Sequence, residues 1–340
     1  MSLSFGIFDH LDRGGVPLGE FYRERLDLLA FCDTLGFYSY HVAEHHGTPL
    51  GMAPSPGIFL SAVAQHTQRI RFGPLVYLLP FYHPIRLAEE IAMLDQLSGG
   101  RLDVGIGRGI SPLETALYGR DPATSQAVYD EALAILRTAL TERVVNVDGT
   151  YFTFHDATLM VEPVQKPMPP LWYGISSVGS AERCARDHVN VISLSATPVV
   201  AEIATAYKAA ALQAGRPDLR VGLGRFVIVA DTDAAAAAIA EPAYVRWHDN
   251  FHYLYHKNHR SPVQGERPRS WASAQEAGLG IAGSPATVLD FLAREVRTTG
   301  VNYLMTQFIF GDMPLAAARR SIELYAAEVM PALRALNGDA

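Results

Sequence analysis

Eight short β-rich runs, separated by longer helical stretches, constrain the fold of this chain more than any other feature. The runs are Leu3 to Phe8, Phe37 to Val42, Ile70 to Leu79, Leu102 to Ile106, Leu171 to Ile175, Val189 to Leu194, Val221 to Val229 and Val301 to Phe308. Strands that alternate with helices form βα units around a parallel sheet, and eight such strands close a TIM-type barrel. The sequence therefore predicts the α/β class and a (β/α)8 barrel.

Helical stretches fill most of the gaps between these runs, and two of them have clear start signals. His83-Pro84 and Ser284-Pro285 each place a proline at a first helical position, where the N–H that proline lacks would have no helical partner. The predicted helices are Glu20 to Leu35, Gly57 to Thr67, Pro84 to Leu97, Ser125 to Thr141, Ala181 to Arg186, Val199 to Ala214, Ala234 to Ala240, Pro285 to Thr298 and Pro314 to Leu336.

Two segments interrupt the alternation. Val144 to Met160 has Asp148-Gly149 between two β-branched and aromatic runs, which predicts a β-hairpin insertion. Trp247 to Gly283 is crowded with histidines, bends and aromatics without a regular period, so we expect a long loop between the seventh and eighth strands. Such loops are usually lids or binding loops, and we expect a lid; the alternative is an ordered helical excursion on the barrel wall or a subunit contact. No linker is visible elsewhere, so residues 1–340 are expected to form a single domain.

Composition excludes several classes of partner. Of the 340 residues 49% are hydrophobic, which allows a core that needs no disulfide or metal for stability. The formal net charge of −7 argues against a nucleic-acid partner.

Cys32 and Cys184 lack zinc-site spacing and fit a reducing compartment. The opening MSLSFGIFDH does not resemble a signal peptide, and the longest apolar run, Gly73 to Tyr82, is roughly half of a ~20-residue membrane span. We expect a cytoplasmic protein with no membrane partner.

Standard cofactor and nucleophile fingerprints are missing. No segment matches the phosphate-binding P-loop. Gly105 to Gly109 (GIGRG) follows a β-rich run but lacks the glycine spacing of a dinucleotide-binding turn. Gly174 to Ser180 (GISSVGS) does not fit the G-x-S-x-G pattern of a nucleophile elbow. Electrons for any redox reaction are therefore expected from outside the chain.

The run His41 to His46 (HVAEHH) supports two interpretations. His41 to His45 matches the H-x-x-E-H pattern of inverted zinc metallopeptidases, which requires a helix. Here the pattern ends a β-rich run, where residues four apart lie roughly 13 Å from each other, too far for one zinc ion, so we expect no metal site. The other interpretation places His45 at the carboxyl end of the second strand, where barrel active sites are built and a histidine can act as a general base. A histidine satisfied by packing remains the alternative.

Three motifs in the same order carry a resemblance to a known family. They are EHH (Glu44 to His46), LLPFYHPIRLAEEIAMLDQLSGGR (Leu78 to Arg101) and GIGRG (Gly105 to Gly109). The chain resembles the bacterial luciferase-like family of flavin-dependent monooxygenases over most of its length, most strongly from Phe5 to Asp121. This resemblance implies a (β/α)8 barrel that binds reduced FMN (FMNH2) without a covalent bond, with the flavin ring over the carboxyl ends of the strands.

The resemblance also implies roles for single residues near the flavin ring. His45 matches the family's active-site histidine, which acts on the oxygen adduct of the flavin. Leu75 and Val76 match the position of a non-prolyl cis peptide under the flavin.

A phosphate site is implied by a second set of positions. Arg108 matches the arginine that pairs with the flavin phosphate, and Ser177, Gly179 and Ser180 match the phosphate-binding turn after the fifth strand. Backbone N–H groups at a helix N-terminus and the planar donors of an arginine are suited to an anion. An ordinary helix cap at Ser180 and a surface ion pair at Arg108 are the alternatives.

The function that the resemblance implies is a two-component monooxygenase. Such an enzyme takes FMNH2 from a separate NAD(P)H:flavin reductase and puts one oxygen atom of O2 into a small organic substrate, and we expect it to assemble as a homodimer. Two alternatives stay open: a deazaflavin-dependent hydride-transfer oxidoreductase on the same barrel, and a flavin-binding protein without catalysis. The sequence leaves the substrate class undecided.

Overall fold

The wall of the barrel is a sheet of parallel strands. The computed structural model describes residues 2–263, 265–336 and 338, and within them the wall has eight positions. The strands are β1 (Ser4–Asp9), β2 (Ser39–Val42), β3 (Arg71–Pro74) with its continuation β4 (Tyr77–Leu78), β5 (Val104–Gly107), β8 (Leu171–Gly174), β9 (Asn190–Ser193), β10 (Val221–Val229) and β12 (Tyr303–Gln307). The order β3-β2-β1-β12-β10-β9-β8-β5-β4 is closed by a bridge between Phe72 and Leu102. The predicted barrel is confirmed, and each predicted β-rich run overlaps one wall position.

Helices surround this wall. They are α1 (Leu18–Thr34), α2 (Pro56–His66), α3 (Pro84–Ser98), α5 (Ser125–Thr141), α6 (Val178–Arg186), α7 (Thr197–Gln213), α8 (Asp233–Lys257), α10 (Pro285–Thr299), α11 (Leu315–Leu324), the π-helical turn η2 (Tyr325–Val329) and α12 (Met330–Leu336). A 3-10 turn, η1 (Leu79–Phe81), precedes α3. Pro84 and Pro285 begin their helices as predicted, and Gly99 ends α3 in the left-handed conformation with φ of 63°. None of the described helices combines the length and apolar character needed to cross a membrane.

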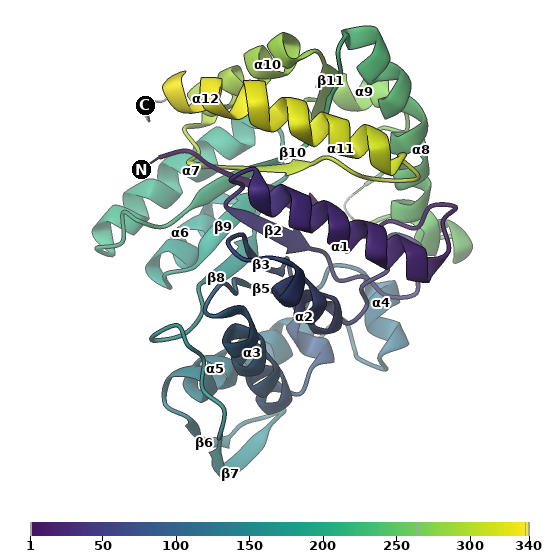
Figure 1. The fold of residues 1–340 in the computed structure, drawn as a ribbon. Helices are drawn as coiled ribbons and strands as arrows, with labels where there is room; N and C mark the ends of the chain where they lie inside the picture. The colour runs from purple at the N-terminus through teal and green to yellow at the C-terminus, as the bar shows by residue number, and fades with distance from the viewer. Residues whose placement is uncertain (1, 264, 337, 339–340) are drawn as a thin grey trace.

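Of the two segments that interrupt the alternation, one folds as predicted and the other does not. The hairpin of β6 (Val144–Asp148) and β7 (Thr153–Thr158) is confirmed and projects from the bottom of the view in Figure 1. The long loop predicted from Trp247 to Gly283 is wrong over much of its length. Its first eleven residues belong to α8, and it also contains α9 (Trp271–Glu276) and the strand β11 (Gly280–Gly283), which pairs with β10. Gln264 lies outside the described residues. The segment is thus largely ordered and partly helical, as in the alternative, and its role as a lid stays a prediction.

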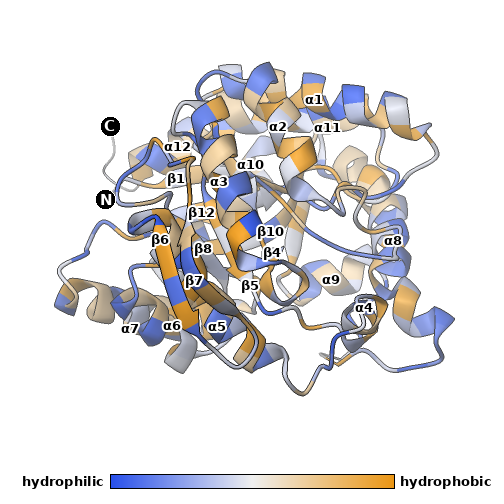
Figure 2. Cartoon of the chain, turned by 90° about the horizontal axis from the view of Figure 1, so that it is seen from below, coloured by the Kyte–Doolittle hydropathy of each residue, from blue (hydrophilic) through white to orange (hydrophobic). Residues whose placement is uncertain are grey.

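Apolar residues gather on the strands at the centre of the molecule, whereas the surrounding helices mix apolar and hydrophilic residues (Figure 2). This division follows from burial, since strands covered on both faces read as continuous apolar runs. All nine residues of β10 are buried, whereas α1 buries one stripe that includes Leu28, Leu29 and Cys32. The wall is therefore a packed core, and ligands must bind at its ends.

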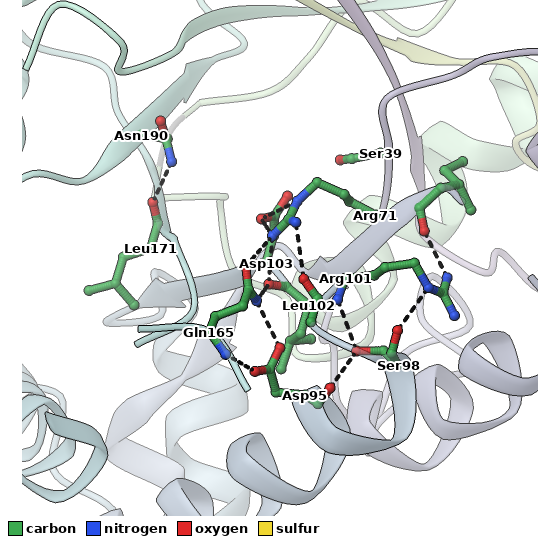
Figure 3. Close-up of polar contacts among 12 residues, drawn as sticks. Ser39, Arg71, Asp95, Ser98, Arg101, Leu102, Asp103, Gln165, Leu171 and Asn190 are labelled. Carbon is green, nitrogen blue, oxygen red and sulfur yellow. Dashed lines mark hydrogen bonds and ion pairs between the residues drawn. The ribbon is translucent and has the colours of Figure 1, made fainter. Parts of the chain in front are cut away.

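Charged side chains at the amino-terminal end of the barrel are held in a network of hydrogen bonds (Figure 3). Arg71 donates hydrogen bonds to Asp103 (2.7 Å) and to Gln165 (2.9 Å). Gln165 in turn donates from its amide to Asp95 at 2.7 Å, and Arg101 donates to the carbonyls of Ala64 and Ile70 at 2.9 Å each. This network ties β3 to β5 next to the closing bridge and leaves the opposite, carboxyl end for the site.

Candidate active site

The turn after β2 is held in place by a buried carboxylate. Glu44 accepts hydrogen bonds from the ring of His46 (2.8 Å), the hydroxyl of Tyr82 (2.8 Å) and the backbone N–H of Leu78 (3.3 Å). Tyr118 lies 2.8 Å from the other ring nitrogen of His46. Burial, only partly offset by these contacts, raises the pKa of Glu44. Since every side-chain polar atom of Glu44 and His46 has a partner, these two residues position the turn and leave its middle residue, His45, for chemistry.

His45 is held by a second carboxylate, which comes from the short helix α4 (Pro112–Leu117). Nδ1 of His45 lies 3.1 Å from Oε1 of Glu114, and Glu114 also accepts a hydrogen bond from the backbone N–H of His46 at 2.8 Å. Burial alone would lower the pKa of His45, but attraction by Glu114, with smaller contributions from Glu44 and Asp12, raises it above its usual value. Because Nδ1 donates to Glu114, Nε2 is the nitrogen that can serve a reacting group.

A third histidine, His10, lies against His45 and was missed by the sequence interpretation. The two rings are stacked, with centroids 5.7 Å apart. Nδ1 of His10 lies 2.9 Å from the amide nitrogen of Gln307 and 3.4 Å from the indole nitrogen of Trp247. An indole N–H can only donate, so Nδ1 is the acceptor and the proton of His10 is on Nε2. Burial, together with repulsion by His45 and Arg267, lowers the pKa of His10 well below its usual value. The site therefore pairs a neutral histidine with one that favours its proton.

One signal in the sequence could have found His10. It follows the first β-rich run directly, so it lies at the same carboxyl end of the barrel as His45. Glu114 gave no comparable signal, because its role depends on a contact across 69 positions of the chain.

The peptide bond between Leu75 and Val76 is cis, at the step from β3 to β4. The strand β5 passes very close to this step. A Cβ atom at Gly107 would lie 2.3 Å from Val76, and one at Gly105 would lie 2.2 Å from the carbonyl oxygen of Pro74. The first two glycines of the GIGRG motif are thus required by close packing against the cis step. The position of Leu75 and Val76 beneath a flavin stays a prediction.

Parallel pairing of β5 with β8 brings the predicted phosphate-binding residues to one end of the barrel. The register pairs Gly105 with Trp172, so Arg108 and the turn that contains Ser177 follow neighbouring strand ends. Arg108 and Arg183 both interact electrostatically with Tyr173, which lies in β8 just before the turn. In the part of the chain that the structure describes, Arg108 makes no hydrogen bond or ion pair. Its donors are therefore free for an external anion.

The turn itself is the N-terminus of α6. Ser177 caps this helix by accepting from the backbone N–H of Ser180 at 3.4 Å, and it also donates to the Ser180 hydroxyl at 3.0 Å. Gly179 is exposed, and a Cβ atom built on it would meet nothing within 4 Å. A phosphate group fits this combination of open backbone, helix N-terminus and unpaired arginine. The helix cap is Ser177 and not Ser180, for which an ordinary cap was the alternative, and Ser180 lies in the first turn of the helix.

His41 and His45, the two histidines of the zinc pattern, contact different parts of the barrel. His41 lies inside the barrel, where its Nε2 is 2.7 Å from the Ser39 hydroxyl and 3.0 Å from that of Tyr303. His45 contacts a different set of residues at the carboxyl end. The two rings therefore have separate surroundings.

A narrow pocket of about 40 Å³ lies beside His10, over the ends of β1, β10 and β12. The helix α8 covers it from outside, at the same side of the barrel as α4 in Figure 1. Most of the lining side chains are aromatic or aliphatic; the lining consists of Phe8, His10, Leu194, Gly224, Arg225, Phe226, Trp247, Phe251, Arg267, Leu279, Met305 and Gln307. The carboxyl end of the barrel thus brings together two histidines of opposite pKa shift, an exposed helix N-terminus and a mostly apolar pocket, a combination typical of an enzyme site.

Comparison with known proteins identifies the family of this chain. Residues 2–303 match the model of the luciferase-like monooxygenase family. The chain is 39% identical to the uncharacterized protein y4wF of Sinorhizobium fredii over 96% of both chains. It is 30% identical to the oxygenase component of the flavin-dependent trigonelline monooxygenase of Acinetobacter baylyi, over 56% of this chain and 53% of that one. The chain belongs to the luciferase-like monooxygenase family and is a flavin-dependent monooxygenase, as the resemblance indicated.

Solved structures agree on the fold. The monooxygenase RslO1 of Streptomyces bottropensis superposes with a TM-score of 0.87 at 26% identity, over 97% of this chain and 99% of that one. The oxygenating constituent of 3,6-diketocamphane monooxygenase of Pseudomonas putida, in complex with FMN, gives a TM-score of 0.80 at 22% identity, over 97% and 98% of the two chains. A coenzyme F420-dependent reductase of Methanopyrus kandleri gives 0.71 at 20% identity, over 97% and 99%. The same barrel thus occurs with FMN and with the deazaflavin.

Proposed function

We propose that this chain is the oxygenase component of a two-component monooxygenase that uses FMNH2. The reduced flavin supplies two electrons, so that one atom of O2 enters a small organic substrate and the other leaves as water. The open anion turn carries this proposal, because Arg108 has unused donors beside the N-terminus of α6. The relative that is an oxygenase component supports a separate NAD(P)H:flavin reductase as the partner.

Each group of residues at the site has its own role in this proposal. Arg108 and the turn of Ser177, Gly179 and Ser180 bind the phosphate, and the step at Leu75 and Val76 supports the ring. His45 holds a proton at Nδ1 toward Glu114 and offers Nε2 to the reacting oxygen. His10, neutral and protonated at Nε2, donates a hydrogen bond into the apolar pocket. Trp247 and Phe251 keep water from the space above the strands.

Flavin titration tests the cofactor assignment. We expect the full chain to bind FMN more tightly than the deazaflavin F420, and Arg108→Ala to weaken FMN binding about tenfold to a hundredfold, since a charge-assisted hydrogen bond contributes about 1.5 to 3 kcal/mol. Riboflavin, which lacks the phosphate, should bind both proteins alike. Arg186→Ala, at the other end of α6, is the matched control and should change neither affinity. Tighter binding of F420, or equal losses for both flavins, would contradict the assignment.

His45→Ala tests the chemistry separately from binding. We expect FMN affinity to stay within about threefold. The rate of product formation should fall about 10² to 10⁴-fold, the usual contribution of a general base. Product and hydrogen peroxide are measured together under O2. His155→Ala, on the exposed hairpin, is the control and should behave as wild type. Wild-type product yield from His45→Ala would remove this residue from the mechanism.

A further inference from the structure

Two arginines line the narrow pocket, and their surroundings differ. Arg225 donates to Glu295 at 2.9 and 3.2 Å, so its charge is neutralised by a carboxylate. The guanidinium of Arg267 makes no hydrogen bond or ion pair with any residue that the structure describes. Its contacts are with aromatic faces, 5.1 Å from the ring centre of Phe251 and 5.9 Å from that of Trp247. Stacking holds the guanidinium plane but satisfies none of its five N–H donors.

Arg267 also borders a second, larger pocket outside the first. This outer pocket has a volume of about 590 Å³ and is lined by His248, Asp249, Tyr253, His256, Lys257, Glu266, Arg267 and Arg269. Arg267 is the one lining residue that the outer and the narrow pocket share within the described chain. Three lining residues are lysine or arginine and two are aspartate or glutamate, and Asp249 already lies 3.6 Å from Arg269. The outer pocket therefore attracts anions toward Arg267.

The narrow pocket determines what the rest of such a ligand must be. The rings of Phe8, Phe226, Trp247 and Phe251 line it, and flat apolar groups pack best against rings. Arg267 is stacked on Phe251 and Trp247, which belong to the same lining. A ligand of the narrow pocket therefore lies next to the guanidinium of Arg267.

We propose that Arg267 binds a carboxylate group of the substrate, whose planar aromatic body occupies the narrow pocket beside His10. A carboxylate matches the two parallel N–H donors of a guanidinium and replaces the acceptor that the chain does not provide. The substrate class is thus an aromatic carboxylate. This inference rests on the proposed monooxygenase function in treating the ligand as the substrate.

Calorimetric titration of the full chain with 2-naphthoate and with its neutral isostere 2-naphthamide tests the proposal. We expect the carboxylate to bind at least tenfold more tightly than the amide. Arg267→Gln should abolish this preference, and Arg267→Lys, which keeps the charge without the planar fork, should retain part of it. Arg269→Gln is the control from the outer pocket and should leave the preference within about threefold. Thermal unfolding verifies that each variant is folded. If Arg267→Gln does not fold, the partial preference expected of Arg267→Lys still tests the proposal.

Three results would overturn the proposal: no binding of 2-naphthoate, equal affinity for the amide, or a preference that persists without Arg267. The titration needs neither flavin nor O2, so it can fail while the oxygenase assignment stands. Conversely, Arg108→Ala should leave the preference for 2-naphthoate unchanged, which separates the substrate pocket from the flavin site.

Discussion

Arginines at the two ends of the barrel differ in what surrounds their guanidinium groups. At the amino-terminal end, Arg71 donates to a carboxylate, an amide oxygen and two backbone carbonyls. At the carboxyl end, Arg108 and Arg267 find no acceptor among the described residues. The difference separates arginines that stabilise the fold from arginines whose donors stay free, to which we assign ligands above. The motif LDQLSGGR supplies Asp95 and Arg101 to the network at the amino-terminal end. Its residues therefore stabilise the barrel and take no part in the chemistry at the opposite end.

The largest effect on stability is expected from Arg71→Ala. The side chain of Asp103 is fully buried, so removing Arg71 leaves an uncompensated carboxylate inside the protein. Breaking a buried ion pair in this way typically costs about 3 to 5 kcal/mol. We expect the free energy of unfolding in urea to fall by this amount, while FMN affinity of the folded protein stays the same.

The comparison becomes sharper with two further variants. Arg216→Ala removes an exposed ion pair with Asp218 and should change the free energy of unfolding by less than about 1 kcal/mol. Arg108→Ala at the carboxyl end should also change it little, because no partner is left buried without its charge. Equal losses of stability for Arg71→Ala and Arg108→Ala would show that the two ends do not differ as described.

A smaller, pH-dependent effect is expected from Glu114→Gln. The pKa of His45 is raised above its usual 6.5, so its contribution to stability is fully present below pH 6.5 and is lost as the pH rises through the folded value. Attraction by His45, acting against burial, lowers the pKa of Glu114 below its usual 4.5, so its contribution is present above pH 4.5 and is lost as the pH falls through the folded value. The pair therefore stabilises the protein most between these limits.

Unfolding of wild type and Glu114→Gln at three pH values measures this window. His45 is 24% exposed in its side chain, so we expect a difference of about 1 kcal/mol near pH 5.5, below the 1.5 to 3 kcal/mol of a fully buried charged hydrogen bond. The difference should shrink at pH 8 and at pH 3. A difference that grows from pH 5.5 to pH 8 would contradict the protonated state of His45.

Sequence reasoning recovered the wall of the barrel because each strand carries its own local signal. Val221 to Val229, for example, is apolar except for Arg225 and is buried throughout. It failed at α8, which was predicted to end at Ala240 but continues through Pro242 to Lys257. Proline removes one helical hydrogen bond, a local penalty that usually ends a helix. Here the packing of Tyr244 and Trp247 against Phe226 outweighs that penalty, and no local pattern reveals it.

The same distinction separates the site residues that were predicted from those that were not. His45 was found because it belongs to a motif and follows a strand. Glu114 and Arg267 act through contacts with residues distant in the chain, so their roles appear only once the barrel is closed. Arg267 in particular follows an irregular stretch in which nothing distinguishes it from the neighbouring Arg269.

The smallest effect is expected from Trp247→Phe, which removes one of two donors to Nδ1 of His10 while keeping an aromatic ring. The indole contact is long, at 3.4 Å, whereas the Gln307 amide lies at 2.9 Å and remains. We expect a loss of about 0.5 to 1 kcal/mol in the free energy of unfolding and an unchanged tautomer, with the proton on Nε2. Nitrogen chemical shifts of the His10 ring measure the tautomer directly.

Two variants complete this last experiment. Trp271→Phe removes an indole N–H that donates to Gln275 and does not reach His10, so it controls for the loss of the indole itself. Trp247→Phe combined with Gln307→Leu removes both donors, and only this double variant should release the proton to either nitrogen. A tautomer that changes in Trp247→Phe alone would mean that the indole, despite its longer contact, fixes the proton of His10, and that the state of this histidine depends on α8.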